Sequence, residues 1–479
     1  MRLIRRALFS AAALAALLSA TALQTGGTFP SIPPVVISGN IPSVVPIPKN
    51  APPNAPPEQF RPFFDWFSWE SFIALNWPAS AAGRGNPNQP NTPSVFTGMT
   101  NTTPVTWGTY KANWELYDQY DKRPTPWDSW AAPYGTGCPN AKSGDKQLVM
   151  VTKGDTELND GVQAFSFPLV DQASNYVFFE VRYNQAYYNF VRGNDATPST
   201  WLYFSKNLPV GNPPTQTPLP PNSASAADSI MVKAAWRNIG KLTPAQRSRY
   251  YAVNAWVLNS ATGQCSQQWM GLVGLHIAQK TKTFPEWIWS TFEQVDNVPP
   301  PGYVPSPADN ARWSFNNGRN DPPTGSQGFA NRPLYAQRGK LAPNPTPTQV
   351  ARVNPIPTTP AGASTVDVNN AFHKALPASS VWQYYELVIT QWPTNPSNFK
   401  PGALRGVYPQ NTGGAFPVNG AVNVTLETYF QTPTLAQGAF GNSCMSCHYA
   451  AASGLRDFSW GFARRPHTDA PPLPPAKSK

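Results

Sequence analysis

The sequence predicts an α+β fold that is predominantly β, with a β-rich body, peripheral helices and a C-terminal helical segment. Two observations predict this class. Eight runs between residues 147 and 392 are rich in Val, Ile, Tyr, Trp and Phe, which favour strands. Proline-rich loops separate these runs, and the helical patterns around them are short.

The expected elements begin near residue 60. A helix buried on more than one face is expected from Phe60 to Trp77, where Pro78 follows it. Shorter helices are expected at Thr106–Gln119 and Val368–Leu376. The expected strands are Gln147–Thr152, Tyr176–Tyr183, Trp201–Ser205, Ser229–Trp236, Tyr250–Leu258, Trp269–Lys280, Trp287–Glu293 and Val381–Trp392.

Composition divides the chain into four parts. Residues 1–22 have a basic start, an apolar stretch at Leu8–Leu18 and a small-residue cleavage site ending at Ala22, which is typical of a signal peptide. Residues 23–58 are expected to be a Pro-rich linker, residues 59–466 the β-rich domain, and residues 467–479 a mobile tail.

The same features predict an exported protein. The apolar stretch is too short for a stable membrane span, and no later segment approaches the length of a span without polar residues. We therefore expect a periplasmic or secreted protein without a membrane span after signal cleavage. The alternative is an uncleaved N-terminal anchor. Cleavage removes three arginines and lowers the formal net charge from +11 to +8. Because these charges are dispersed, nucleic-acid binding is not indicated, whereas a basic surface could steer an acidic partner.

The most specific motif lies at residues 444–448 and reads Cys-Met-Ser-Cys-His. This pattern is the attachment site of a c-type haem: Cys444 and Cys447 bond the two vinyl groups, and His448 ligates the iron. On a helix these three positions share one face, so they reach one macrocycle. Ser443 is a good N-cap for that helix. The motif occurs once, so one covalent haem c is expected in a segment of about 424–466.

Two other interpretations of the motif are open. A structural zinc ion needs a fourth ligand, usually from a second close pair of Cys or His, and the sequence contains no such pair. A redox-active pair of thiols does not require His448.

The opposite iron ligand is expected upstream, because no methionine follows His448. His276 is the first candidate and Met270 a weaker one. A regular strand would place both on one face with Gly274, where the missing side chain would leave a gap for a porphyrin. The alternatives are a core histidine bonded to a carbonyl and an open or water-bound iron. The remaining candidates are His373, His467, Met99, Met150 and Met231.

The other two cysteines, Cys138 and Cys265, are expected to form a disulfide in an oxidising compartment, with two separate buried thiols as the alternative. The carboxylates Glu286, Glu293 and Asp296 lie near an aromatic run, but nothing in their spacing demands a catalytic role. Aromatic residues of that run are expected to fill the core.

The chain resembles a bacterial family of long, exported, monohaem cytochrome-c-like proteins with one haem motif near the C-terminus. The matching stretches are residues 74–78, 272–281, 287–297 and 441–448. Its layout is also similar to that of cytochromes c′-beta and their hydroxylamine-oxidising relatives. These are β-rich, with an aspartate and aromatic residues soon after the motif, as in Asp457-Phe458-Ser459-Trp460 here. This second resemblance implies a five-coordinate iron that binds small molecules.

Three hypotheses about function follow from these observations. We expect electron transfer by a low-spin haem that exchanges electrons with a periplasmic redox partner. The alternative is a haem-dependent oxidoreductase or gas-binding protein, with an open distal site and a small-molecule substrate. A third hypothesis, in which the β-rich body binds a ligand and haem is ancillary, is also open. No catalytic residue can be named from the sequence.

Overall fold

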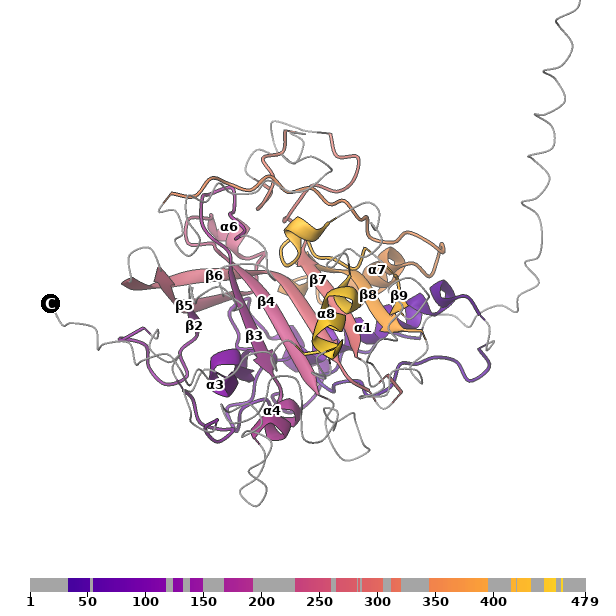
Figure 1. The fold of residues 1–479 in the computed structure, drawn as a ribbon, viewed down its shortest axis with the longest axis horizontal. Helices are drawn as coiled ribbons and strands as arrows, with labels where there is room; N and C mark the ends of the chain where they lie inside the picture. Colours follow the sequence, from indigo (N-terminus) through magenta and orange to yellow (C-terminus); the bar gives the residue numbers. More distant parts are fainter. Residues whose placement is uncertain are drawn as a thin grey trace, which may run out of the picture.

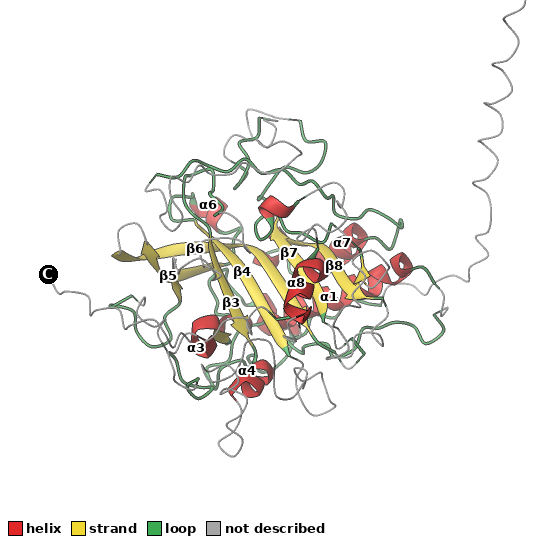
Figure 2. Cartoon of the chain, viewed as in Figure 1, coloured by secondary structure: helices red, strands yellow, loops and turns green. Residues whose placement is uncertain are grey.

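The computed structural model describes residues 33–51, 55–117, 124–131, 138–149, 168–192, 229–259, 264–281, 283–284, 287–304, 312–319, 344–394, 415–418, 420–431, 443–453 and 458–459. One large sheet crosses the body, with short helices around it (Figure 1). Loops make up much of the rest (Figure 2). The predicted β-rich α+β class is confirmed.

The described sheet has nine strands in the order β1-β3-β4-β6-β7-β8-β9, with β5 paired to β6 and β2 to β5. The β2–β5 pair is parallel and the other pairs are antiparallel. The strands are β1 (Lys111–Ala112), β2 (Gln147–Val149), β3 (Phe178–Tyr183), β4 (Ile230–Asn238), β5 (Ala252–Asn259), β6 (Gln264–Gln279), β7 (Ile288–Gln294), β8 (Tyr385–Pro393) and β9 (Ala415–Phe416).

Helices lie on both sides of this sheet. The α-helices are α1 (Arg61–Leu75), α2 (Pro93–Thr97), α3 (Asn113–Tyr117), α4 (Gln185–Arg192), α6 (Pro244–Arg247), α7 (Thr365–Ala375) and α8 (Cys444–Ser453). The 3₁₀ helices are η1 (Pro57–Phe60), η2 (Trp107–Thr109), η4 (Val381–Tyr384) and η6 (Thr428–Phe430). Figure 1 shows α8 in front of the sheet and α1 behind it.

Helix α1 packs on one face because alternate residues of β7 point to it. Ser68 Oγ lies 2.7 Å from Ser290 Oγ, and the rings of Phe72 and Phe292 stack with centroids 4.2 Å apart. Successive residues of a strand point to opposite faces, so Trp289 and its alternate neighbours face away from α1. The second face of the sheet is therefore left for α8.

Two predicted elements differ from the structure. At Thr106–Gln119 the structure has η2, β1 and α3 instead of one helix, because Lys111 and Ala112 pair with β3. At Val381–Trp392 the strand starts only at Tyr385, after the 3₁₀ turn η4. The predicted strand Trp201–Ser205 lies outside the described residues, and the other seven each overlap a strand of the sheet.

Residues 33–51, in the middle of the predicted linker, are attached to the body. Residues 33–51 form no helix or strand, in keeping with their prolines. Yet Val45 is buried among apolar side chains, and Gln279 Nε2 donates to the Pro42 carbonyl at 2.6 Å. The expectation that the folded part begins near Phe60 is thus wrong, because apolar residues between the prolines pack on α1 and the sheet. The predicted signal peptide and the tail at 467–479 lie outside the described residues.

Cys138 and Cys265 form a disulfide, the pair expected above, and it closes a loop with a sequence separation of 127. It ties the outer end of β6 to the segment before β2. None of the described helices is long and apolar enough to cross a membrane.

Candidate functional site

Helix α8 begins at the motif, and Ser443 caps its first turn. Ser443 Oγ accepts a hydrogen bond from the backbone N–H of Ser446 at 3.2 Å, which satisfies a group that a helix start leaves unpaired. The N–H of Cys447 donates to the Ser443 carbonyl at 3.2 Å. The structure therefore puts Cys444, Cys447 and His448 at helical spacing on one face, as the motif predicts.

Strand β8 holds this helix on the sheet. The backbone N–H of Met445 donates to Gln391 Oε1 at 2.7 Å, and Gln391 Nε2 donates to the Pro417 carbonyl at 2.6 Å. The Met445 side chain is fully buried in the main core. Ser443 also forms a parallel bridge with Ala421. The start of α8 is thus fixed by contacts with two other segments.

The His448 ring is oriented by one hydrogen bond and one aromatic contact. Its Nδ1–H donates to the Phe458 carbonyl at 2.7 Å. A carbonyl can only accept, so Nδ1 carries the proton and the neutral ring keeps its lone pair on Nε2. The Trp289 ring of β7 packs against the imidazole with centroids 4.3 Å apart. The nitrogen that could bind a metal is therefore defined by the fold.

The surroundings keep His448 neutral. Burial lowers the pKa of His448 to about 4, and the positive charge of Lys233, together with that of His276 when its ring is protonated, acts in the same direction. The bond to Phe458 and the charge of Glu427 oppose this shift. Because a metal binds the neutral imidazole, His448 is ready to act as a ligand over the physiological range.

The two motif cysteines are thiols and take part in no disulfide. Burial raises the pKa of Cys444 well above its ordinary value, and the nearby charges of Glu427 and Cys447 add to this effect. A cysteine of a redox-active pair has a lowered pKa, because the thiolate is the nucleophile. The environment of Cys444 has the opposite effect.

Two rows of strand residues lie on the face beneath α8. Met231, Ala278 and Trp289 are neighbours across β4, β6 and β7. Lys233 and His276 begin the next row, which continues at Thr291. Trp289 contacts His448, and Lys233 and His276 are near enough to affect the pKa of His448. We therefore call this face of β4, β6 and β7 the floor of the site.

His276 is paired with a carboxylate that sequence reasoning missed. Its Nε2 lies 2.8 Å from Glu427 Oε1. Burial raises the pKa of Glu427, but the charges of His276 and Lys233 and the hydrogen bonds to this carboxylate outweigh burial, so its pKa is lowered. An ionised carboxylate only accepts, so Nε2 carries a proton. His276 Nδ1 is buried and has no hydrogen-bond partner among the described residues.

A second buried polar atom on this floor also lacks a partner. Trp289 Nε1 has no hydrogen-bond acceptor in the described part of the chain. A buried polar group left unpaired costs about 1–3 kcal/mol, so a further hydrogen bond or ligand at His276 Nδ1 or Trp289 Nε1 would be stabilising.

The expected gap at Gly274 is filled by protein. A Cβ at this position would lie 2.1 Å from Thr425 Oγ1 and 3.2 Å from Asn423 Oδ1. The glycine thus admits the segment that carries Glu427, and the expectation that a porphyrin lies against Gly274 is wrong.

Met270 and His276 do not share a face. The β4–β6 register places Leu272 opposite Trp236 but Gly274 opposite Ala235, so Val273 is a bulge. The extra residue of a bulge reverses which face of the sheet the following side chains of the strand point to. Met270 therefore faces the α1 side of the sheet, whereas His276 faces the α8 side.

The other candidates are placed as follows. His373 on α7 bonds the Tyr385 carbonyl at 2.7 Å and packs against Trp69 on the α1 side. Met231 lies on the floor of the site, and its Sδ accepts a hydrogen bond from Ser459 Oγ at 3.2 Å. Met99 follows α2 and packs against the edge of the main core. His467 and Met150 lie outside the described residues.

Glu293 and Asp296, two of the three carboxylates considered above, form ion pairs with arginines. Glu293 pairs with Arg352 at 2.8 Å, and Asp296 pairs with Arg249 at 2.6 Å. Glu286 lies outside the described residues. These ion pairs fasten loops to the sheet.

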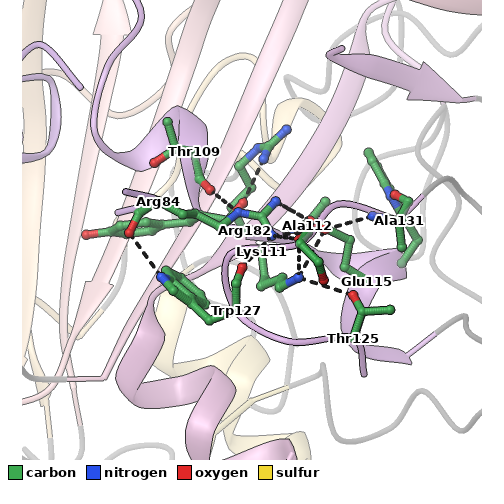
Figure 3. Close-up of polar contacts among 12 residues, drawn as sticks. Arg84, Thr109, Lys111, Ala112, Glu115, Thr125, Trp127, Ala131 and Arg182 are labelled. Carbon is green, nitrogen blue, oxygen red and sulfur yellow. Dashed lines mark hydrogen bonds and ion pairs between the residues drawn. The ribbon is translucent and has the colours of Figure 1, made fainter. Parts of the chain in front are cut away.

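A second polar cluster surrounds Arg84 (Figure 3). Arg84 bonds the Thr109 carbonyl at 2.6 Å and Glu115 Oε2 at 2.8 Å, and Lys111 Nζ bonds the Ser129 carbonyl at 2.6 Å. Burial lowers the pKa of Lys111 to about 8, partly offset by Glu115. The charged groups have protein partners, so this cluster is structural: it joins loops around β1 and α3.

Among the described residues, no group of three or more His, Cys, Asp and Glu side chains could hold a metal ion. A zinc site built from protein ligands alone is thus not supported there. No family model matches the chain, and it matches neither a curated protein nor a solved structure.

Proposed function

We propose that the chain is an exported c-type cytochrome that carries one covalent haem and transfers electrons. Cys444 and Cys447 would hold the porphyrin through thioether bonds, and His448 Nε2 would ligate the iron. The observation that carries this proposal is the 2.7 Å bond from His448 Nδ1–H to the Phe458 carbonyl. In a metal-bound histidine, the ring nitrogen that does not bind the metal usually donates a hydrogen bond of this kind. That bond fixes the tautomer and the orientation of the ring.

The residues beneath α8 fit a haem. His276 Nδ1 and Trp289 Nε1 are buried on the floor of the site without partners among the described residues. The first has a lone pair when the ring is neutral, and the second is a donor suited to a porphyrin carboxylate. When bound, the haem supplies a one-electron couple. The chain orients the ligand His448, holds it neutral and surrounds it with apolar side chains.

The environment of the motif favours haem over a redox-active pair of thiols. Burial raises the pKa of Cys444, which disfavours the thiolate that disulfide exchange needs. The disulfide between Cys138 and Cys265 supports the proposed export, because such bonds persist in oxidising compartments.

One observation favours the alternative, a haem enzyme or gas-binding protein with an open distal site. Met231 Sδ accepts a hydrogen bond from Ser459, so ligation by this sulfur would break a bond, and His276 has one of its two ring nitrogens, Nε2, engaged by Glu427. The iron would then be five-coordinate, as the resemblance to cytochromes c′-beta implies.

The test is to produce the full chain together with c-type haem maturation enzymes. We expect a haem that resists acid-acetone extraction, a mass increase of one haem, and the pyridine haemochrome spectrum of two thioether bonds. A Cys444→Ala/Cys447→Ala variant is the matched control and should lose the haem on extraction. Absorption spectra unmoved by CO support the electron carrier, whereas rapid CO binding supports the alternative. A chain that leaves maturation without covalent haem overturns the proposal.

A further inference from the structure

We infer that His276 supplies the second axial ligand of the haem iron through Nδ1, and that Glu427 is the positioning residue that presents this nitrogen. This inference rests on the proposed function. It assigns a ligand atom and a partner residue that the motif does not contain.

The first argument is the hydrogen bond between the two side chains. Glu427 Oε1 accepts from His276 Nε2 at 2.8 Å, and Glu427 Oε2 accepts from the backbone N–H of Asn423 at 3.0 Å. Both carboxylate oxygens are thus used. Because Nε2 carries the proton, the neutral ring has its lone pair on Nδ1. That atom is buried and has no partner among the described residues.

The second argument is the position of His276. It lies on β6 one row from Trp289, whose ring contacts the His448 imidazole. Thr291, the residue of β7 opposite His276, points to the same face of the sheet as Trp289. Of the described histidines, His373 bonds a backbone carbonyl on the α1 side of the sheet.

The third argument is that the chain fixes Glu427 in place. Asn423 Nδ2 donates to Thr291 Oγ1 at 2.9 Å, and the N–H of Val424 donates to Glu293 Oε1 at 2.8 Å. Gly274 makes room for Thr425 of the same segment. A carboxylate held this firmly can set the tautomer and rotation of a histidine, as carboxylates do for metal-bound imidazoles.

Met231 is the rival on the same floor. Its Sδ is the acceptor of the Ser459 hydroxyl at 3.2 Å, so it makes a bond that ligation would break. His276 Nδ1 has no such bond to lose. The structure therefore favours nitrogen over sulfur as the second ligand.

The experiment uses the full haem-loaded chain and compares spin state by absorption and electron paramagnetic resonance. We expect a low-spin wild type, and a high-spin His276→Ala variant that keeps covalent haem and returns to low spin with added imidazole. His373→Ala and Met231→Leu are the controls and should stay low-spin. If His276→Ala fails to fold, His276→Met should fold and shift the near-infrared charge-transfer band.

Two further measurements test the ligand atom and Glu427. In the reduced, diamagnetic protein, long-range ¹⁵N–¹H correlations should show a proton on Nε2 of His276 and on Nδ1 of His448. Glu427→Leu should give a mixture of spin states, whereas Glu427→Gln, which keeps an acceptor, should remain low-spin.

The outcomes separate this inference from the proposed function. An unchanged low-spin spectrum in His276→Ala, or a high-spin wild type with covalent haem, overturns the ligand and leaves the cytochrome standing. A proton on Nδ1 of His276 overturns the ligand atom, and an unaltered Glu427→Leu spectrum overturns the positioning role. Only loss of covalent haem in the wild type removes both.

Discussion

His448 Nδ1 lies 2.7 Å from the carbonyl oxygen of Phe458, ten residues further along the chain. This bond links helix α8 to the segment that follows it, and the Trp289 ring packs against the same imidazole. The orientation of one imidazole therefore depends on three segments: the motif helix, strand β7 and the backbone at residue 458.

We expect His448 to titrate far below an ordinary histidine. In the haem-free Cys444→Ala/Cys447→Ala variant, NMR of the ring should give a midpoint near pH 4, because burial disfavours the imidazolium. Between about pH 4 and 6.5 the unfolded chain binds this proton and the folded chain does not, so His448 makes stability fall as the pH is lowered. Lys233→Gln should raise the midpoint by removing a positive charge. A midpoint near 6.5, the ordinary value for a histidine, would contradict the burial of this ring.

Gly274→Ala should destabilise the protein by roughly 1–3 kcal/mol, because the added Cβ overpacks a filled site. That atom would lie 2.1 Å from Thr425 Oγ1. Thr425→Ala should recover part of the loss, with a coupling of about 0.5–3 kcal/mol in urea unfolding. Gly271→Ala is the control: its Cβ would meet Ile239 at 2.8 Å, and Thr425→Ala should not relieve it. Additive effects of the Gly274 and Thr425 substitutions would show that the two residues do not touch.

Gln391→Ala should loosen α8. It leaves the buried N–H of Met445 without its 2.7 Å acceptor, at a cost of about 1–3 kcal/mol. Hydrogen exchange of the amides in residues 444–453 should become faster. Gln383→Ala is the matched control, since Gln383 Nε2 bonds the His373 carbonyl at 2.7 Å near the end of α7. It should speed exchange in α7 and leave α8 unchanged; equal effects on α8 would argue against the Gln391 contact.

Asp65→Asn should stabilise the protein at neutral pH. Burial raises the pKa of Asp65 to about 6 from 3.8, although Arg61 and the hydrogen bond from Thr365 oppose this shift. Between about pH 3.8 and pH 6 the folded chain keeps this proton on Asp65 and the unfolded chain does not. The wild type therefore loses stability as the pH rises through this range. Removing the charge should gain up to about 3 kcal/mol above pH 6 and nothing below about pH 4.

Urea unfolding at pH 3.5 and 7 measures this difference. Asp367→Asn is the control with the opposite sign, because hydrogen bonds from Ser364, at the N-cap of α7, lower the pKa of Asp367. It should lose stability at neutral pH. A gain for Asp65→Asn that is the same at both pH values would contradict a charge effect.

Much of the architecture could be predicted from local sequence. Runs such as 288–294 consist of residues that favour strands, and the structure has strand β7 there. The spacing of Cys444, Cys447 and His448 predicts a helix with Ser443 as its cap, and α8 begins as expected. These features depend on neighbours within a few residues, so the sequence alone was sufficient.

The sequence could not predict which residues face the motif. A strict alternation would put Met270 and His276 on one face, but the bulge at Val273 separates them. The Lys111–Ala112 segment became a strand for a similar reason, because pairing with β3 outweighed its helical pattern. Register and bulges depend on contacts between distant strands, and no local pattern encodes them.

The sequence by itself determined the motif, its helix and the strands that make up the body. Only the tertiary structure decided that Phe458 orients His448, that Glu427 pairs with His276, and that Trp289 lies between the sheet and the motif. Each of these is a contact between segments far apart or separated by a loop. Such contacts form only when the packing of the sheet and α8 brings the side chains together. The half of the site opposite Cys444 and Cys447 could therefore be defined only from the tertiary structure and not from the sequence.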